Sequence, residues 1–377
     1  MTAVGRVAVV GCGVSALAAA IALAKGGVEV EVFEQKPELS ALGSGISLQT
    51  NAMRVFDALG VWGDVRAAGC AFDGLVLRAP GPDAAVVMRA PEGRGGEYPS
   101  GMGMPRTELA RILFDHAKRA GAAFRFGAEV TGVRSEDTEA FVAVGGEEIT
   151  GPYDLVIGAD GLHSAVRAAV GILTRPEPTG MGIWRAFVSR PEEVTTTELY
   201  YGGPAYIAGY TPTGEDSMYA FLVEDARNEA FEASAAEGAR AMHGLSAGYG
   251  GPWESIRADL QRGAPVNYTR FTAHLVEEPW HSGRAVIIGD AAHSCPPTIA
   301  QGAAQALEDA LVLTELLLGR DAVDESLWRE FAERRLPRVR AVVEASVQLA
   351  DWQREGARDA DMGGLLGGLA AKMAEPA

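Results

Sequence analysis

The sequence predicts a mixed α/β protein with a parallel sheet, an antiparallel sheet in a second domain and helices at its C-terminal end. Three observations predict this class. A strand, a glycine turn, an alanine-rich helix and a second strand follow one another within residues 6–34, which starts a parallel sheet. Aromatic residues at strand spacing fill 181–223, as in antiparallel strands. Helical periodicity dominates from residue 302 onward.

Each element has its own local signal. Arg6–Val10 is a short apolar run, and the alanine-rich helix Ser15–Lys25 ends at two glycines, which accommodate a left-handed turn. The strand Val28–Glu34 follows. Further along we expect loops and hairpins over 79–104, a helix over Pro105–Ala120, short strands within 123–157, helices within 225–262, a buried strand at Ala285–Ile288, a long helix from about Gly302, and helices from 323 that end in a loose glycine-rich tail at 363–368.

Size and charge exclude several classes of protein. At about 150 residues per domain, 377 residues suggest two or three domains. The formal net charge of −17 opposes binding to nucleic acid and to anionic membrane surfaces. The longest basic cluster is interpreted as the solvated face of a helix, and it consists of Arg334, Arg335, Arg338 and Arg340.

The cysteines and the apolar N-terminal segment indicate a cytoplasmic protein. Cys12, Cys70 and Cys295 have no paired spacing, so they favour neither a disulfide framework nor a metal site. Residues 7–24 are almost all apolar, but glycines interrupt them and an alternating strand follows, unlike a signal peptide. We therefore expect no bound metal and no membrane contact.

The turn after the first strand carries the first chemical motif, Gly11-Cys12-Gly13-Val14-Ser15-Ala16. The first glycine permits a tight turn, the second lets a pyrophosphate approach the backbone, and the small Ala16 lets the helix pack closely. Glu34 ends the second strand, where a carboxylate can accept hydrogen bonds from ribose hydroxyls. This context favours a dinucleotide site over an ordinary tight turn, and both NAD and FAD remain possible ligands.

Two further sequence segments, which we call blocks, indicate which of these two ligands binds. Residues 157–167 read Ile-Gly-Ala-Asp-Gly-Leu-His-Ser-Ala-Val-Arg, and residues 288–309 begin Ile-Gly-Asp-Ala-Ala-His-Ser-Cys-Pro-Pro and end Gln-Ala-Leu-Glu-Asp. With the first motif, these blocks resemble the single-component flavoprotein aromatic hydroxylases, the para-hydroxybenzoate hydroxylase-like group that includes salicylate and urate hydroxylases. They lie in the family's order and span residues 6 to about 310. The resemblance implies bound FAD.

The resemblance also implies a fold: a Rossmann-like FAD-binding domain of the GR2 type, an inserted substrate domain with an antiparallel sheet, and C-terminal helices. The expected limits are 1–72, 101–175 and 273–322 for the three parts of the FAD-binding domain, 73–100 and 176–272 for a hairpin and the main sheet of the substrate domain, and 323–377 for the C-terminal helical segment.

The family's FAD contacts can be carried over residue by residue. Asp290 follows a buried strand and would accept a hydrogen bond from a ribityl hydroxyl, or would serve only as a cap or turn residue. Arg106 would reach the flavin or simply start a helix. The complete expected set is Gly11, Gly13, Val14, Ser15, Ala16, Glu34, Gln35, Lys36, Gly45, Ile46, Arg106, Asp160, Gly161, Gly289, Asp290, Pro297, Gly302 and Ala303.

Some of these matches have specific alternatives. Asp160-Gly161 with Arg167 is similar to a fingerprint that contacts FAD and the nicotinamide nucleotide, but a strand-end turn with a surface arginine is the alternative. The segment 43–48 is similar to the family segment along the flavin's path. Gln49 stands where many relatives have proline or glycine, which leaves the shape of this loop open.

Candidate residues on the substrate side follow from the same resemblance. Arg185 would hold a substrate anion, or would pair with a surface acid. Tyr206 and Tyr210 have the same strand parity, so we expect them on one side, where they orient a phenol or pack as core aromatics; Tyr201 is a similar candidate. Pro297 would shape the pocket in which oxygen reacts. His293 is either a base or a structural hydrogen-bonding group.

The reaction implied by the resemblance is hydroxylation of a small phenolic or N-heteroaromatic substrate by O₂ and NADH or NADPH, through a flavin C4a-hydroperoxide. Most of this chemistry belongs to the cofactor, and the protein supplies position, dryness and electrostatics. The alternatives are an FAD monooxygenase of larger polyketide-type or non-aromatic substrates, and a flavoprotein without oxygenase activity. The expected assembly is a monomer or homodimer.

Overall fold

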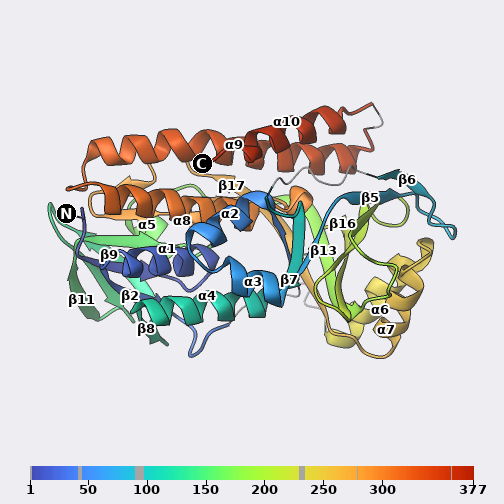
Figure 1. Cartoon of the computed structure of the whole chain (residues 1–377), viewed down its shortest axis with the longest axis horizontal. Coiled ribbons are helices and arrows are strands. Elements are labelled where there is room, and N and C mark those ends of the chain that lie inside the picture. The colour runs from blue at the N-terminus through green and yellow to red at the C-terminus, as the bar shows by residue number, and fades with distance from the viewer. Residues whose placement is uncertain (1, 41–44, 90–96, 229–233, 278, 358) are drawn as a thin grey trace.

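The computed structural model describes the whole chain except residues 1, 41–44, 90–96, 229–233, 278 and 358. The described residues form two lobes, a larger one built on a parallel sheet and a smaller one built on an antiparallel sheet (Figure 1). Two C-terminal helices run along one side of the larger lobe toward the smaller one (Figure 1). No helix of the described residues is long and apolar enough to span a membrane.

The parallel sheet has the strand order β18-β19-β12-β1-β2-β8, and all neighbours are parallel except β18 and β19. Its central strands are almost wholly apolar, as expected for strands covered on both faces. The strands expected at the two ends of the first motif and at the two later blocks are confirmed. Their bounds are β1 (Arg6–Val10), β2 (Glu29–Glu34), β8 (Ala123–Phe126), β12 (Leu155–Gly158), β18 (His281–Ser282) and β19 (Ala285–Ile287).

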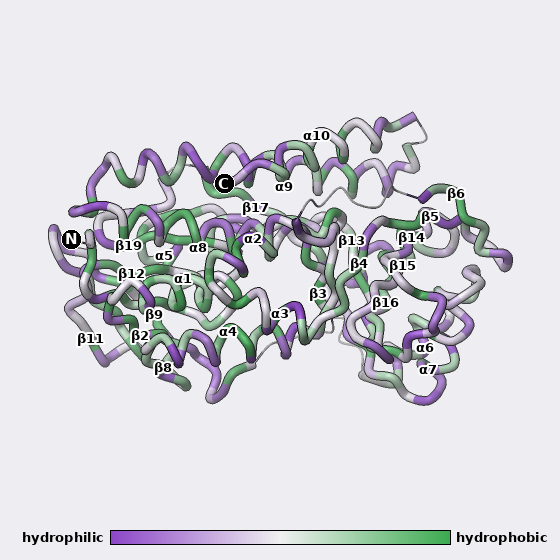
Figure 2. Tube along the Cα trace, viewed as in Figure 1, coloured by the Kyte–Doolittle hydropathy of each residue, from purple (hydrophilic) through white to green (hydrophobic). Residues whose placement is uncertain are grey.

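The apolar helix α1 (Val14–Lys25) packs between α4 (Arg106–Ala120) and α8 (Gly302–Gly319) against this sheet. Figure 2 shows the most hydrophobic stretches of the larger lobe in these strands and in α1 and α8. An antiparallel sheet also contacts β1 and β12, and α5 (Ala165–Ala169) packs on it. Its strands are β9 (Val130–Ser135), β10 (Ala140–Val144) and β11 (Glu148–Tyr153).

The sheet of the smaller lobe has the order β20-β17-β13-β16-β15-β14-β5-β6, and only β14 and β5 pair in parallel. The aromatic strands expected over 181–223 form its centre. Helices α6 (Ala235–Leu245) and α7 (Trp253–Gln261) cover one face over an aromatic core. The strands are β5 (Leu75–Arg78), β6 (Val86–Arg89), β13 (Glu177–Ser189), β14 (Thr197–Tyr201), β15 (Ile207–Pro212), β16 (Ser217–Asp225), β17 (Val266–Leu275) and β20 (His293–Ser294).

A small antiparallel sheet joins the two lobes, and it consists of β3 (Gly45–Gln49), β7 (Gly101–Pro105) and β4 (Cys70–Phe72). It lies directly on β15 and β16 because two of its residues are glycines. A Cβ at Gly45 would stand 2.7 Å from the Tyr219 ring, and one at Gly103 would overlap the carbonyl of Pro212. The helices α2 (Thr50–Ala58) and α3 (Trp62–Ala68) follow β3.

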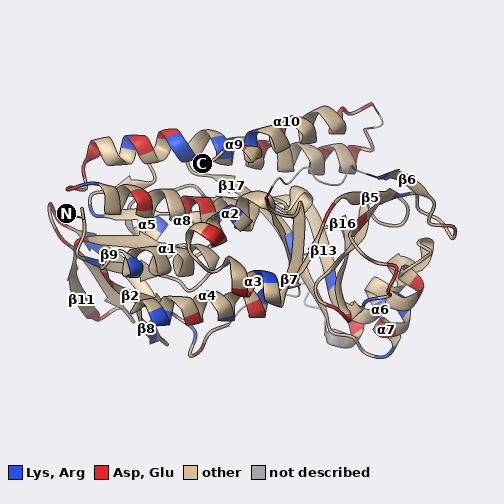
Figure 3. Ribbon diagram, in the orientation of Figure 1, with Lys and Arg blue, Asp and Glu red and all other residues tan. Residues whose placement is uncertain are grey.

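The C-terminal helices differ from the sequence prediction in two respects. Residues 363–368 are not a loose tail, because they belong to the helix α10 (Met362–Ala374), whose Leu369 and Met373 pack on α9 (Glu325–Glu355). The basic cluster is not a solvated face either. Arg335 and Arg338 are buried and form ion pairs with Glu308 and Asp309 of α8, whereas Arg334 and Arg340 pair with surface acids (Figure 3).

Candidate active site

The loop between β1 and α1 opens onto free space at the start of a helix. Gly11 has a φ of +101°, and any Cβ there would overlap the carbonyl of Ala159. No atom lies within 4 Å of the position that a Cβ of Gly13 would take, so open space precedes the first turn of α1. The first N–H groups of α1 point into this space, and the helix dipole favours an anion there. Val14 begins the helix, and Ser15 and Ala16 are buried beneath the loop.

Glu34 lies at the end of β2, next to this loop. Burial, and then the charge of Glu34, raise the pKa of Cys12 to about 12, so the Cys12 thiol is protonated and close to the Glu34 carboxylate. One Glu34 oxygen accepts a hydrogen bond from the backbone N–H of Lys36 at 2.9 Å. Gln35 is exposed, and the Lys36 ammonium donates to Ser40 at 3.1 Å. Glu34 thus lies beside the loop that precedes α1.

The residues of the second block hold their own loop together. The Asp160 carboxylate accepts hydrogen bonds from the Ser164 hydroxyl at 2.6 Å and from the Val166 N–H at 3.0 Å, at the start of α5. Gly161 has a φ of +79° with no atom within 4 Å of its Cβ position. The Asp160 carboxylate is thus a helix cap, while its backbone lies against the Gly11 turn.

Arg167 connects the second block to the third. Its guanidinium is buried and donates to the carbonyl oxygens of Ala291 and Leu162, both at 2.8 Å, and to Nε2 of His274 at 3.2 Å. The surface arginine considered as an alternative is therefore wrong. Because Ala291 follows Asp290, Arg167 fixes the turn that carries that carboxylate.

The turn β19–η2 (Gly289–Ala291) is held by Asp309 of α8. One Asp309 oxygen accepts from the N–H of Gly289 at 2.9 Å and from Nε2 of His293 at 2.7 Å. The other oxygen accepts from Arg335 Nε at 2.8 Å. Burial alone would raise the pKa of Asp309, but His293 and Arg335 hold it at about 2. His293 therefore has the structural hydrogen bond that was one of its two expected roles.

Asp290 and Arg106 enter a recess between the lobes. Both side chains are exposed, yet burial raises the pKa of Asp290 and lowers the pKa of Arg106. Both side chains are thus accessible to solvent and yet surrounded by many protein atoms, so the space that they border is largely enclosed by protein. The charge of Arg106 acts on Asp290, and Arg185 and Tyr219 act on Arg106, so these groups face one recess. Arg106 Nε donates to the carbonyl of Gly45 at 3.1 Å.

The segment before α8 borders the same recess. Cys295 is near enough to Asp290 for its pKa to be raised by that charge, although burial is the larger cause of its value of about 11. Pro297 is exposed in η3 (Pro297–Ile299), and open space surrounds Gly302 at the start of α8, followed by the half-buried Ala303.

Gln49 shapes the loop whose form the sequence left open. Its Nε2 donates to the carbonyl of Ile299 at 2.6 Å, which ties β3 to η3. Ile46 is buried in β3. Residues 43 and 44 of the expected flavin segment lie outside the described residues.

The face of the eight-stranded sheet that looks away from α6 and α7 consists of three rows of side chains. One row packs under the small sheet, and includes Tyr219 and Thr211. A second, which we call the α9 row, packs with Ala350 of α9 and consists of Ile183, Val223, Ile207 and Tyr201. Between them lies the middle row, which consists of Arg185, Phe221, Gly209 and Leu199.

The middle row is open, because the side chains of Arg185, Phe221 and Leu199 are only half-buried at the centre of the molecule. Gly209 lets the aromatic ring lie flat: a Cβ there would stand 2.6 Å from Phe221 and 2.7 Å from Leu199. Arg185 donates a hydrogen bond to Thr269 and has no carboxylate partner among the described ion pairs. The middle row therefore forms an apolar floor with the aromatic ring of Phe221, and the cation of Arg185 lies at one side of this floor.

Tyr206 and Tyr210 do not share a side, so that expectation is wrong. Tyr210 is fully buried in the core beneath α7, where its hydroxyl bonds to Glu198 and Tyr200. Tyr206 precedes β15 in irregular backbone, packs beside the α9 row and donates to Asp225 at 2.8 Å. Strand parity fails because Tyr206 lies outside the regular strand. Tyr210 packs as a core aromatic and does not reach the recess.

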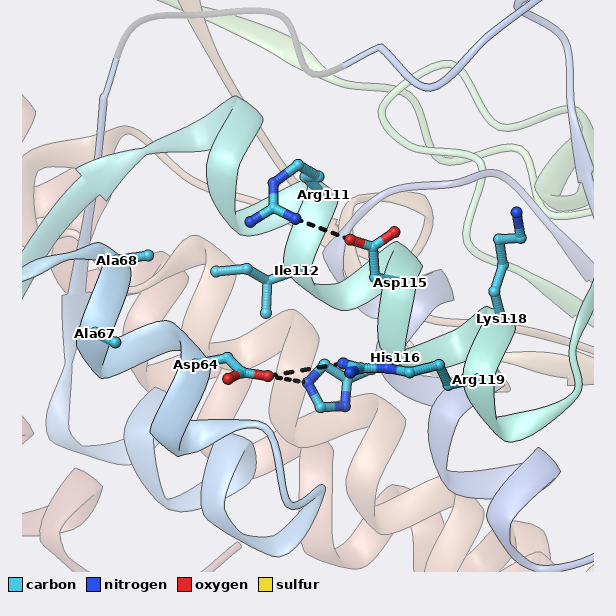
Figure 4. Close-up of a pocket in the computed structure, with 9 residues that line it drawn as sticks. All are labelled: Asp64, Ala67, Ala68, Arg111, Ile112, Asp115, His116, Lys118 and Arg119. Carbon is cyan, nitrogen blue, oxygen red and sulfur yellow. Dashed lines mark hydrogen bonds and ion pairs between the residues drawn. The ribbon is translucent and has the colours of Figure 1, made fainter.

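A separate cavity of about 700 Å³ lies between α3 and α4 on the outside of the larger lobe (Figure 4). Most of its charged groups are paired: Asp64 lies 2.7 Å from His116 and 3.7 Å from Arg119, and Arg111 pairs with Asp115 at 2.9 Å. None of the three sequence blocks contributes to it.

Comparison with known proteins shows the family of the chain. The model of the family described as "FAD binding domain" matches residues 5–346. The chain is 33% identical to an aurachin C monooxygenase/isomerase of Stigmatella aurantiaca, over 82% of this chain and 80% of that protein. It is 30% identical to a 3-amino-4-hydroxybenzoate 2-monooxygenase of Streptomyces cremeus, over 92% and 87%. The tetrameric 2-methyl-3-hydroxypyridine-5-carboxylic acid oxygenase has the same fold, with a TM-score of 0.81 at 23% identity over 98% of this chain and 95% of that one.

Proposed function

Since the chain belongs to the FAD-binding family of flavin monooxygenases and aromatic hydroxylases, we propose that it hydroxylates a small phenolic or N-heteroaromatic compound with O₂ and NADH or NADPH. Its membership makes it an FAD-dependent monooxygenase; the substrate and the electron donor are the proposal. The observation that carries the proposal is the recess, in which Arg106, Arg185 and Asp290 meet an aromatic floor.

The residues around the recess fit FAD. Open space stands before Gly13 and Gly302, at the starts of two helices whose dipoles favour anionic groups, and Asp290 offers a desolvated acceptor between them. In this proposal the α1 loop holds the pyrophosphate, Glu34 the ribose and Asp290 the ribityl chain, with Arg106, Gly45 and Pro297 near the ring. Bound FAD would accept hydride from the nicotinamide nucleotide and activate O₂ for transfer of one oxygen atom to the substrate.

Arg185 is proposed to bind an anionic group of the substrate. It repels Arg106 across the recess, and an anion between the two guanidinium groups would relieve this repulsion. A guanidinium also suits a planar carboxylate or phenolate, which it can hold through two hydrogen bonds. The ring of such a substrate would rest on Phe221 in the middle row.

A larger substrate is the second candidate, and one observation favours it. The α9 row continues the middle row with apolar side chains, including Ile183, Val223 and Ile207, so the floor extends beyond a single ring. The similarity to the aurachin C enzyme supports this extension. A product with an oxidised ring that bears an alkyl chain would favour this candidate.

The test is NAD(P)H oxidation by the purified holoenzyme with a panel of phenols, aminophenols, pyridines and purines, with hydrogen peroxide counted in parallel. A substrate is a compound that accelerates oxidation without matching peroxide release. If flavin is bound and reduced but no panel member does this, the small-aromatic proposal is wrong. If NAD(P)H fails to reduce the flavin at all, the choice of electron donor is also wrong.

A further inference from the structure

The chain enters α8 through a residue in a left-handed conformation. Ala300, at the end of η3, has a φ of +52° and a ψ of +35°. A Cβ disfavours this conformation, so glycine usually takes such a position, and an alanine stays there only where its surroundings hold it. Residues held in this way cluster at functional sites. Ala300 lies between Pro297 and Gly302, two residues that border the recess, so what holds it bears on the site.

Side-chain amides from another part of the chain hold both neighbours of Ala300. The Nε2 group of Gln49 donates to the carbonyl oxygen of Ile299 at 2.6 Å, and the Nε2 group of Gln301 donates to Oε1 of Gln49 at 2.7 Å. The amide of Asn51 donates to Oε1 of Gln301 at 3.0 Å. We call Gln49, Asn51 and Gln301 the amide clasp. It ties the residues on either side of Ala300 to β3 and α2, which are at least 250 residues away in the chain.

The amide clasp rests on the buried ion pairs between α8 and α9. Asn51 is 2% exposed, and its Nδ2 group also donates to Oε1 of Glu308 at 3.0 Å. Glu308 forms ion pairs with Arg335 and Arg338, both of which are buried. Gln49 stands where many relatives have proline or glycine, neither of which has a side-chain amide. The clasp is therefore not a general feature of the family.

The clasp also turns the N-cap side chain of α8 inward. Gln301 is the N-cap residue, yet its side chain is 2% exposed and makes no capping hydrogen bond within the described part of the chain. The first hydrogen bond of the helix is the one that the N–H of Gln305 donates to the carbonyl of Gln301 at 2.9 Å. The helical N–H groups before Gln305 therefore have no intrahelical partners, and open space surrounds Gly302. The start of α8 is thus left open toward the recess, where its dipole favours an anion.

We propose that the amide clasp holds Ala300 in its left-handed conformation and thereby positions the start of α8, so that the protein binds reduced FAD more tightly than it would without the clasp. The reduced flavin ring carries an additional negative charge, which the N-terminal end of a helix stabilises more than it stabilises the neutral oxidised ring. The three amides act through the backbone of α8, so they are positioning residues. This inference rests on the part of the proposed function that places the flavin ring beside Pro297.

The first test measures the reduction potential of bound FAD, without substrate and without oxygen. Gln49→Met keeps the length of the side chain and removes its hydrogen bonds to Ile299 and Gln301. The affinity of this variant for reduced FAD should fall about tenfold relative to its affinity for oxidised FAD, which makes the potential about 30 mV more negative for a two-electron couple. If the variant loses FAD during purification, titration of the apoprotein with oxidised and with reduced FAD measures the same ratio. A potential equal to that of the wild type would overturn the proposal.

Two control variants separate positioning from stability. Gln261→Met makes the same substitution at a surface glutamine, whose amide lies 3.0 Å from Nε2 of His243, and it should leave the potential unchanged. Leu313→Ala removes a buried side chain in the later turns of α8, so it should lower the Tm and also leave the potential unchanged. A shift of the potential in Leu313→Ala as large as that in Gln49→Met would show that general loosening of α8 is the cause, and the proposal would be wrong.

The second test asks whether Ala300 is the residue that the clasp holds. Glycine adopts the left-handed conformation without strain, so Ala300→Gly added to Gln49→Met should restore about half or more of the lost potential. The matched control is Ala84→Gly in the same background, because Ala84 is the other described alanine with a positive φ, at +45°, and lies in the core of the smaller lobe. This control should restore nothing. If the double variant with Ala300→Gly stays at the potential of Gln49→Met, the proposal is overturned.

The outcomes separate the amide clasp from the proposed substrate, because neither test needs a substrate. An unchanged potential in Gln49→Met overturns the role of the clasp and leaves the proposed hydroxylation of an aromatic compound intact. If the potential shifts as expected and no compound of the panel is hydroxylated, the clasp is supported and the small-aromatic substrate is wrong.

Discussion

Asp290 and Arg185 face the same recess, but their surroundings suit them to different roles. Asp290 sits on a turn whose backbone Arg167 and Asp309 hold from two sides. Arg185 projects from the middle of a strand, and its guanidinium donates to the hydroxyl of Thr269. A fixed acceptor suits a resident cofactor, and an adjustable cation suits a substrate that comes and goes.

We predict that Asp290→Ala weakens FAD binding by about ten- to a hundredfold, because it removes a charged acceptor from a desolvated site. Arg185→Ala should keep its FAD and raise the KM for an anionic aromatic substrate by about tenfold or more. Flavin content per purified protein and steady-state kinetics measure the two effects, with Asp290→Asn as the control that keeps an acceptor. Equal FAD content in the two alanine variants would contradict these assignments.

His274 makes stability depend on pH. Its Nε2 accepts from Arg167 and its Nδ1 lies 2.7 Å from the Ser294 hydroxyl, which fits a neutral ring. Burial first, and then the charges of Arg167 and His293, lower the pKa of His274 to about 4. The unfolded state therefore takes up a proton near pH 6.5 that the folded state does not, and stability falls as the pH falls from about 6.5 to about 4.

We predict that His274→Gln removes this part of the pH dependence, which amounts to at most about 1.4 kcal/mol per pH unit. Urea unfolding at pH 5, 6 and 7 measures the slope. The exposed His163→Gln is the control and should leave the slope unchanged. Equal slopes in wild type and His274→Gln would mean that His274 is protonated in the folded protein.

At the residue level, the sequence predicted most reliably those features that depend on the local conformation of the backbone. The turn at Gly11 is read from neighbours in the chain, as are the strand ends that carry Glu34 and Asp290, and the structure has this turn and these strand ends. The expectation that Tyr206 and Tyr210 share a side is wrong, because Tyr206 precedes the regular strand β15 and strand parity does not extend to it.

At the level of elements, the contact between α8 and α9 positions the recess. Arg335 is wholly buried and bonds to both Glu308 and Asp309, and Asp309 in turn holds the turn of Gly289. Sequence could not show this, because 26 residues separate Arg335 from Asp309 and an arginine on a helix reads as surface. The acids were visible as the end of the third block, but their partner was not.

We predict that Arg335→Met destabilises the protein by about 3–5 kcal/mol, because it removes the buried arginine of Asp309 and one of the two buried arginines of Glu308. It should also weaken FAD binding, since Asp309 would no longer be fixed against Gly289. Denaturant unfolding and flavin titration measure the two effects. The control is Arg340→Met, which removes an exposed pair with Glu277 and should cost less than about 1 kcal/mol. If both variants unfold alike, the buried cluster is not what joins α9 to the larger lobe.

At the level of the whole molecule, the two sheets divide the work. The parallel sheet ends in the Gly11 loop and in the turns that face the recess. The antiparallel sheet forms the floor of the recess, and the small sheet and α9 close the two sides of that floor. Local patterns revealed both sheets, but how the middle row comes to lie open between two covered rows depends on glycines at 45, 103 and 209, and the first two contact segments that are far away in the chain.

The net charge of −17 acts on the association of the anionic electron donor. A field of this sign repels NADH and repels NADPH more strongly, because NADPH carries an additional phosphate, and salt screens this repulsion over about 10 Å at 0.1 M. We predict that raising KCl from about 0.01 M to 0.15 M lowers the KM for NADPH, lowers that for NADH less, and leaves the KM for O₂ unchanged because O₂ has no charge. Steady-state kinetics at constant pH measure all three. A KM for NADPH that rises with salt would mean instead that basic groups at the mouth of the recess, with Arg106 and Arg185 behind them, outweigh the field of the whole molecule and steer the nucleotide in.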